Sequence, residues 1–163
     1  MNDCQSSLLV TVRDYRKKNR NGHIVVVFDM DEVLLSCDPD TDTVEFSQTW
    51  YNILSFLSSK NITTILWTMG DRDYMVDMLY TTSLFGYFKT LYSKESKVLN
   101  ILGSNKSGAL IRYHYPESYI VLVDDTPSNG DEDYDLIIPH KSITSTWLQL
   151  NKFINDVGKT QCR

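Results

Sequence analysis

The residues best suited to chemistry are two carboxylates that follow an apolar run. Ile24–Phe28 is continuously apolar, and Asp29 and Asp31 come directly after it, two positions apart. If the chain turns there, one carboxylate can attack a phosphoryl group while the other holds a proton for the leaving oxygen, since one group cannot be nucleophile and acid at once. The pair alone is equally compatible with a plain acidic loop, so the rest of such a site has to be found elsewhere in the chain.

A second apolar run, Ile62–Trp67, ends in residues that could bind a phosphoryl group. Thr68 offers a hydroxyl, and Met69 and Gly70 follow it. A glycine at this point lets backbone amides come close to an anion, and a hydroxyl can donate to one of its oxygens.

A third apolar run, Tyr119–Val123, ends in the acidic pair Asp124 and Asp125. Paired acids there, facing Asp29, would form a site of hard oxygen ligands that suits Mg²⁺. Magnesium would let an anionic nucleophile approach an anionic phosphate and would neutralise the developing charge. Such chemistry also needs a lysine that pairs with the carboxylates and the phosphate.

The elements that must position these residues alternate between strands and helices. Continuous apolar runs are typical of strands buried on both faces of a parallel sheet, and apolar residues at helical spacing lie between them. The alternation predicts an α/β fold with a mostly parallel sheet, whose ligands bind at the carboxyl ends of the strands. We also expect a polar loop at Ser36–Phe46 and a closing helix, beginning near Ile143, that ends near Gly158.

Length and composition indicate one ordinary globular domain. The chain has 163 residues, of which 42% are hydrophobic and 23% charged, enough to bury a core without disulfides or metal. We expect a polar lead-in at residues 1–22 and a single domain at residues 23–163. No apolar run is long enough for a membrane span, and Met1–Leu9 lacks the pattern of a signal peptide. Three scattered cysteines favour a reducing compartment, so we expect an intracellular protein, nuclear or cytoplasmic, with no membrane partner.

The net charge of −5 is unevenly distributed. Asp29–Glu45 and Asp124–Asp135 together hold 13 of the 21 acidic residues, directly after predicted strands. Five of the 16 basic residues lie in Arg13–Arg20. We interpret that stretch as a solvated arm, with the docking of an acidic or phosphorylated partner as the alternative.

Taken in order, these pieces resemble the haloacid dehalogenase (HAD) superfamily of aspartyl-phosphate phosphotransferases, over about residues 24–138. More narrowly, the stretch Asp29-Met-Asp-Glu-Val-Leu is similar to the DxDE(T/V)L signature of the FCP/SCP-type phosphatases, which act on the C-terminal domain of RNA polymerase II. Leu66-Trp-Thr-Met-Gly with Tyr74, Gly86-Tyr-Phe-Lys and Val123-Asp-Asp-Thr-Pro also fit that pattern. The resemblance implies a three-layer, HAD-like (Rossmannoid) sandwich around the sheet.

The resemblance also implies roles for the four aspartates. Asp29 would be the nucleophile that forms the aspartyl-phosphate. Asp31 would be the general acid and then the base that activates water, while its backbone carbonyl binds Mg²⁺. Asp125 would be the side-chain metal ligand, and Asp124 would orient either Asp125 or the lysine.

Phosphate binding would fall to Thr68, Met69, Gly70 and a lysine. Lys106 lies 18 positions before Asp124, close to the usual spacing of the family. The alternative is Lys97, in a stretch KVLNILG that is similar to the family's KDLxxLG. We favour Lys106 because of its spacing.

The expected function is therefore a Mg²⁺-dependent phosphatase whose substrate is a phosphorylated macromolecule, first of all phosphoserine or phosphothreonine of a protein. Only 38 residues separate Asp29 from Thr68, and 37 separate Thr68 from Lys106. These intervals leave no room for a separate cap domain, so the site should be open. The first interval is shorter than in the C-terminal-domain phosphatases, so we expect a reduced insert for peptide recognition.

Three other functions use similar residues. A polynucleotide 3′-phosphatase on the same scaffold would be expected to show a basic groove, which the acidic balance disfavours. A non-catalytic scaffold or binding protein would not need Asp29, Asp31 and Thr68 together. A receiver-like switch places its acidic pair on the first strand and its phosphoacceptor on a later one, the reverse of the order in this chain.

Overall fold

The computed structural model describes residues 21–38, 40–99 and 106–161. Within them, five parallel strands form one central sheet in the order β5-β4-β1-β6-β7. The strands are β1 (Ile24–Phe28), β4 (Thr63–Trp67), β5 (Thr90–Tyr92), β6 (Tyr119–Asp124) and β7 (Leu136–Pro139). The predicted α/β fold with a parallel sheet is confirmed.

The two central strands are buried along their whole length. Every residue of β1 and β6 is shielded from solvent, and the two strands pair in register from Ile24 opposite Tyr119 to Phe28 opposite Val123. Val26 and Phe28 pack into one hydrophobic cluster, whereas Val25 and Val27 pack into another. A strand with both faces buried has to be apolar at every position, which is why the sequence pattern identifies it.

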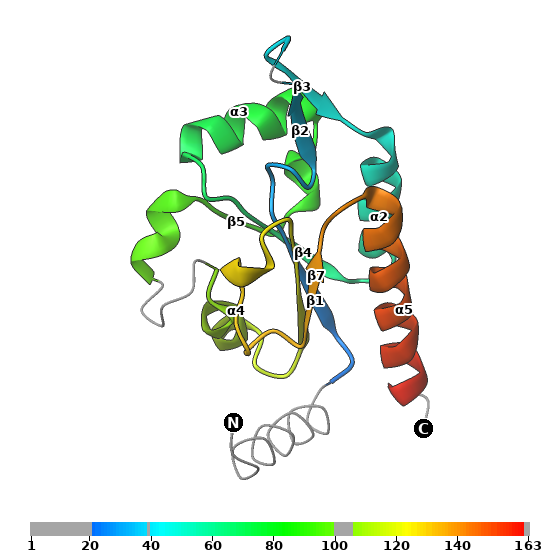
Figure 1. Ribbon diagram of the computed structural model, residues 1–163. Coiled ribbons are helices and arrows are strands. Elements are labelled where there is room, and N and C mark those ends of the chain that lie inside the picture. The colour runs from blue at the N-terminus through cyan, green and yellow to red at the C-terminus, as the bar shows by residue number, and fades with distance from the viewer. Residues whose placement is uncertain (1–20, 39, 100–105, 162–163) are drawn as a thin grey trace.

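Helices cover both faces of the sheet. In Figure 1, α2 and α5 lie side by side on one face of the sheet, and α4 lies on the other. The contact between α2 and α5 includes the edge-on packing of Phe56 against Trp147, with ring centroids 5.3 Å apart. The helices are α2 (Gln48–Ser59), α3 (Arg72–Thr82), α4 (Gly108–His114) and α5 (Ile143–Gln161), with short 3-10 helices η1 (Phe85–Tyr87), η2 (Lys94–Leu99) and η3 (Pro127–Asn129).

A tight turn follows β1, and a side chain of α2 holds it in place. The carbonyl of Met30 accepts the backbone N–H groups of Leu34 and Leu35, each at 3.0 Å. The buried indole of Trp50 donates to the carbonyl of Val33 at 3.1 Å. Ser47 caps the start of α2 by accepting the backbone N–H of Thr49, and the helix places Trp50 where it can hold the turn that carries Asp29 and Asp31.

The prediction of a polar loop at Ser36–Phe46 is wrong. An antiparallel hairpin occupies it, with β2 (Leu35–Asp38) paired to β3 (Thr43–Phe46). The side chains of β3 are mostly exposed, so apolar alternation gives no strand signal there. Asp42, with a φ of 52°, takes the left-handed conformation that aspartate tolerates in tight turns.

The closing helix also differs from expectation, because α5 runs through Gly158 to Gln161. A glycine inside a helix costs only about 1 kcal/mol, too little to end a helix that is otherwise favoured. The arm at Arg13–Arg20 and nearly all of the predicted lead-in lie outside the described residues. Over the part of the chain that the structure describes, no helix is both long and apolar enough to cross a membrane.

Candidate active site

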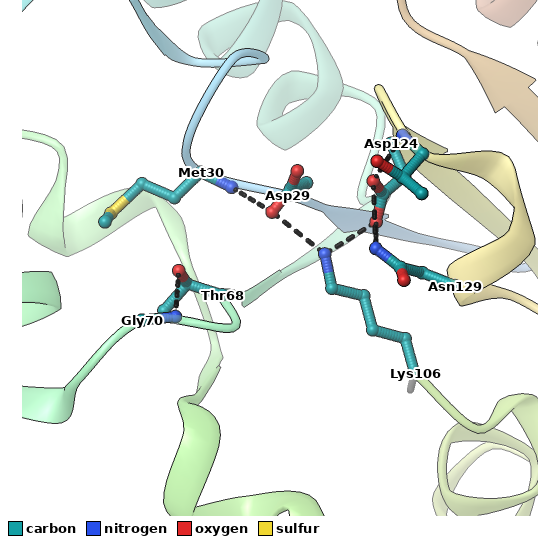
Figure 2. A network of polar contacts seen from close by, with 8 residues as sticks. Asp29, Met30, Thr68, Gly70, Lys106, Asp124 and Asn129 are labelled. Atoms are coloured by element: carbon teal, nitrogen blue, oxygen red, sulfur yellow. Dashed lines mark hydrogen bonds and ion pairs between the residues drawn. The ribbon is translucent and has the colours of Figure 1, made fainter. Parts of the chain in front are cut away.

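The predicted site residues lie at the carboxyl edge of the central strands. Asp29 follows β1, Thr68 follows β4, and Asp124 is the last residue of β6. Because β1 lies between β4 and β6, the three side chains come from neighbouring strands and lie along one edge of the sheet (Figure 2). Strand topology therefore assembles residues that are up to 95 positions apart in the sequence.

Lys106 lies at the centre of this group. Its ammonium contacts Asp29 Oδ1 at 2.9 Å and Asp124 Oδ2 at 2.6 Å (Figure 2). The lysine is completely buried, and an ammonium that far from water is stable only when it is paired and hydrogen-bonded. The structure thus brings the favoured lysine to the two carboxylates, whereas it describes nothing of the side chain of the alternative, Lys97, which belongs to η2.

Asn129, which sequence reasoning missed, joins Lys106 to Asp124. Its side-chain amide nitrogen donates to Asp124 Oδ2 at 3.3 Å, and its backbone carbonyl accepts the backbone N–H of Lys106 at 2.7 Å. Asp124 also accepts the backbone N–H of Thr126 at 2.8 Å. These bonds occupy the Asp124 carboxylate, so its position is fixed before any ligand arrives.

Burial raises the pKa of Asp29 to about 8 in the metal-free protein. Desolvation is the largest cause; the nearby charge of Asp124 adds to it, and the pairing with Lys106 opposes it. Asp29 Oδ1 also accepts the backbone N–H of Met30 at 3.0 Å. An added cation beside this carboxyl would favour its ionised form.

Three carboxylates could hold such a cation. Oxygen atoms of Asp29, Asp124 and Asp125 all lie within 4.8 Å of one another. Asp29 and Asp124 are buried and Asp125 is exposed, so the cluster opens to solvent on one side. An all-oxygen, multiply charged donor set fits Mg²⁺ and leaves room for water and phosphate oxygens. The side chain of Asp31, the fourth predicted metal residue, does not belong to this cluster.

Asp31 instead lies beside the loop that follows β4, residues 68–70, which is predicted to bind phosphate. Its Oδ1 accepts the hydroxyl of Tyr74, on α3, at 2.9 Å. Thr68 is fully buried, and its Oγ1 accepts the backbone N–H of Gly70 at 3.0 Å (Figure 2). Met69 is partly buried in the same loop.

A cavity of about 520 Å³ opens next to Asp125. The turn after β1 and the β2–β3 hairpin form one side, and the segment between β7 and α5 forms the other. Its ionisable residues are Glu32, Glu45, Asp125, His140 and Lys141. Burial lowers the pKa of His140, whose Nδ1 lies 2.7 Å from Thr146 Oγ1. The cavity extends the site toward solvent and is on balance acidic.

Residues 3–112 match a family described as "Protein of unknown function (DUF705)". Two viral proteins are similar in sequence. An uncharacterized 41.0 kDa protein in the P143-LEF5 intergenic region of Cryptophlebia leucotreta granulosis virus is 39% identical over 70 residues, 42% of this chain and 20% of that protein. An uncharacterized 38.0 kDa protein in the same region of Autographa californica nuclear polyhedrosis virus is 29% identical over 100 residues, 59% of this chain and 30% of that protein. The matches therefore span less than a third of either relative.

Solved structures share the fold at low identity. A hydrolase from Streptococcus pneumoniae has a TM-score of 0.62 at 14% identity, covering 80% of this chain and 99% of that one. The fission yeast RNA polymerase II CTD phosphatase Fcp1, bound to beryllium fluoride, has a TM-score of 0.52 at 15% identity, covering 95% of this chain and 54% of that one. A HAD superfamily (subfamily III A) hydrolase from Legionella pneumophila has a TM-score of 0.50 at 12% identity, covering 92% of each chain. The fold is that of the HAD hydrolases.

Proposed function

The chain belongs to the DUF705 family, and from the geometry of its strand-end site we propose that it is a Mg²⁺-dependent phosphatase that acts through an aspartyl-phosphate. The observation that carries this proposal is the buried Lys106 ammonium between Asp29 and Asp124. A structural ion pair needs one carboxylate. A lysine that joins two, beside a third in Asp125 and the hydroxyl of Thr68, suits the binding of a phosphoryl group.

Each residue has a task in the proposed reaction. An oxygen of Asp29 attacks phosphorus, and the bond from phosphorus to the leaving oxygen breaks as Asp31 gives that oxygen a proton. Lys106, the hydroxyl of Thr68 and the backbone amides of Met69 and Gly70 hold the phosphoryl oxygens.

Hydrolysis of the intermediate returns the enzyme to its starting state. Asp31, now ionised, takes a proton from water as the water oxygen attacks phosphorus, and the bond from phosphorus to Asp29 breaks. Asp29, Asp124 and Asp125 would hold Mg²⁺ with the backbone carbonyl of Asp31, and the bound ion supplies positive charge that lets the carboxylate approach the phosphate.

We propose phosphoserine or phosphothreonine of a protein as the substrate. The described residues between Asp29 and Thr68 form the hairpin β2–β3, α2 and β4, with no separate cap domain that would exclude a large substrate. Acidic side chains in the adjoining cavity, Glu32 and Glu45, disfavour a polyanionic strand. The similarity of Asp29–Leu34 to the signature of the C-terminal-domain phosphatases also supports a phosphoprotein.

The test is turnover of para-nitrophenyl phosphate by purified protein, with Mg²⁺ and with EDTA. Phosphoserine peptides, phosphothreonine peptides and 3′-phosphorylated oligonucleotides are then compared by kcat/KM. The proposal predicts turnover only with Mg²⁺ and a preference for the peptides. Preference for the oligonucleotides would overturn the substrate assignment, and failure to hydrolyse any of them would overturn the phosphatase itself.

A further inference from the structure

We propose that Tyr74 is a positioning residue that aims the proton of Asp31 at the leaving oxygen; this inference rests on the proposed function. Tyr74 is the third residue of α3, and Asp31 lies in the turn after β1, 43 positions earlier. Their side chains meet at 2.9 Å, from the hydroxyl of Tyr74 to Oδ1 of Asp31. The contact therefore joins two elements that carry different parts of the site.

The hydrogen bond makes the two oxygens of Asp31 inequivalent. The phenol donates, so Oδ1 acts as an acceptor and has the character of the carbonyl oxygen when the carboxyl is protonated. The acidic proton then belongs on Oδ2. Without Tyr74, either oxygen of Asp31 could carry the proton, and the side chain could adopt several rotamers.

Oδ2 is the oxygen that faces the phosphate-binding loop. A Cβ built on Gly70 would lie 3.9 Å from Asp31 Oδ2, 3.4 Å from Thr68 Oγ1 and 3.4 Å from Tyr74 Cδ1. The acid, the hydroxyl and the tyrosine ring thus surround the backbone of Gly70. A Cβ at that position would make ordinary van der Waals contact with all three.

In the first step of the reaction, the proton on Oδ2 moves to the leaving oxygen as the bond from that oxygen to phosphorus breaks. In the second step, Oδ2 accepts a proton from the attacking water. In this proposal Tyr74 keeps its own proton throughout and acts through Asp31.

The experiment compares Tyr74→Phe with the wild type on two substrates of different leaving group. Proton donation matters most for an alkoxide leaving group, as in phosphoserine, and least for para-nitrophenolate, which leaves readily without a proton. A well-placed general acid contributes about 100-fold to 10,000-fold. We expect Tyr74→Phe to lower kcat/KM about 10-fold or more for a phosphoserine peptide and less than about threefold for para-nitrophenyl phosphate.

Two comparisons separate this role from a purely structural one. Tyr80→Phe changes a tyrosine of the same helix that is 71% exposed and should leave both substrates unaffected. Adding Tyr74→Phe to Asp31→Asn should cause no further loss, because two residues that act through one proton are not additive.

Equal losses on both substrates, or additive losses with Asp31→Asn, would overturn the role of Tyr74 while leaving the phosphatase intact. If the wild type hydrolyses neither substrate with Mg²⁺ present, the proposed function fails, and the role of Tyr74 fails with it.

Discussion

At the scale of single residues, Lys106 connects the two buried carboxylates of the site, Asp29 and Asp124, and is itself buried between them. Lys106→Ala should lower kcat/KM by about 100-fold to 1,000-fold or more, the range seen when one donor to a developing negative charge is removed. Lys97→Ala should do little. The measurement is Mg²⁺-dependent turnover, with a thermal melt of each variant to confirm that it is folded at the assay temperature. If Lys97→Ala is the inactive variant, the assignment by spacing is wrong.

The raised pKa of Asp29 predicts a pH dependence of stability in the metal-free protein. The folded state holds this proton up to a pH of about 8, whereas the unfolded chain releases it near the ordinary value of 3.8. The stabilisation is therefore complete below that value and is lost as the pH rises toward 8. Asp29→Asn does not titrate, so the melting temperature of wild type minus that of Asp29→Asn, in EDTA, should fall from pH 5 to pH 8.

This difference is the informative quantity because two histidines act in the opposite direction. Burial lowers the pKa of His23 and of His140, so both cost stability as the pH falls below about 6.5. Their contributions are the same in the two proteins and cancel. A difference that stays constant or rises with pH would contradict the raised pKa of Asp29.

The sequence allowed some site residues to be predicted because each directly follows a buried strand. Asp29, Thr68 and Asp124 come into proximity through the order of parallel strands alone. Asn129 and Tyr74 could not be assigned in this way. Asn129 reaches Asp124 only because η3 folds back after β6, and Tyr74 reaches Asp31 only through the packing of α3, so their partners depend on tertiary structure.

At the scale of elements, burial decided what could be predicted. The strands β1 and β6 are covered on both faces and give an unbroken apolar pattern. The hairpin β2–β3 is held by backbone pairing with exposed side chains, and α5 continues through Gly158 because its other residues favour the helix. A hydrophobic pattern reports neither of these.

The start of α4 is sensitive to substitution, because the backbone of Gly108 lies close to other side chains. A Cβ on Gly108 would lie 2.7 Å from both Asp131 Oδ1 and Asp133 Cβ, and the backbone N–H of Gly108 donates to Asp131 Oδ2 at 3.1 Å. Gly108→Ala should therefore destabilise the protein by about 1–3 kcal/mol, the usual cost of overpacking. It should also reduce turnover, since Lys106 lies two residues earlier.

Gly158→Ala is the matched control for that variant. Nothing lies within 4 Å of a Cβ at this position, and the glycine is in a helix, so alanine should stabilise by up to about 1 kcal/mol. Chemical denaturation of both variants gives the free energies of unfolding. A Gly108→Ala protein as stable as the wild type would show that α4 can move to relieve the contact.

At the scale of the whole molecule, the acidic cluster links metal binding to stability. Without a cation, the acidic side chains of Asp29, Asp124 and Asp125 crowd together, which contributes to the raised pKa of Asp29, and Mg²⁺ that binds only the folded state should raise the melting temperature. At 100 times the dissociation constant the gain is about 2.7 kcal/mol, and each kcal/mol corresponds to roughly 2–4 °C for a chain of this size.

Asp125→Ala should remove most of this Mg²⁺-induced shift and raise the melting temperature in EDTA, because one repelling charge is gone. Calcium should also stabilise the wild type but support turnover poorly, since its longer and looser coordination misplaces nucleophile and phosphate. The measurement is a thermal melt of both proteins in EDTA and in millimolar Mg²⁺. A shift that persists in full in Asp125→Ala would remove Asp125 from the ligand set and leave Asp29 and Asp124 as the side-chain ligands.

The central claim is covalent catalysis through Asp29, and the most direct test is to trap the phosphoenzyme. Wild type and Asp29→Asn are mixed with para-nitrophenyl phosphate and Mg²⁺, quenched rapidly in acid and digested, and the peptides are identified by mass spectrometry. The amide keeps the shape of the side chain but is too weak a nucleophile to attack phosphorus. We expect phosphate on the peptide that contains Asp29 in the wild type only, together with loss of turnover in a folded Asp29→Asn protein. Phosphate on another residue, or substantial turnover by Asp29→Asn, would contradict the account.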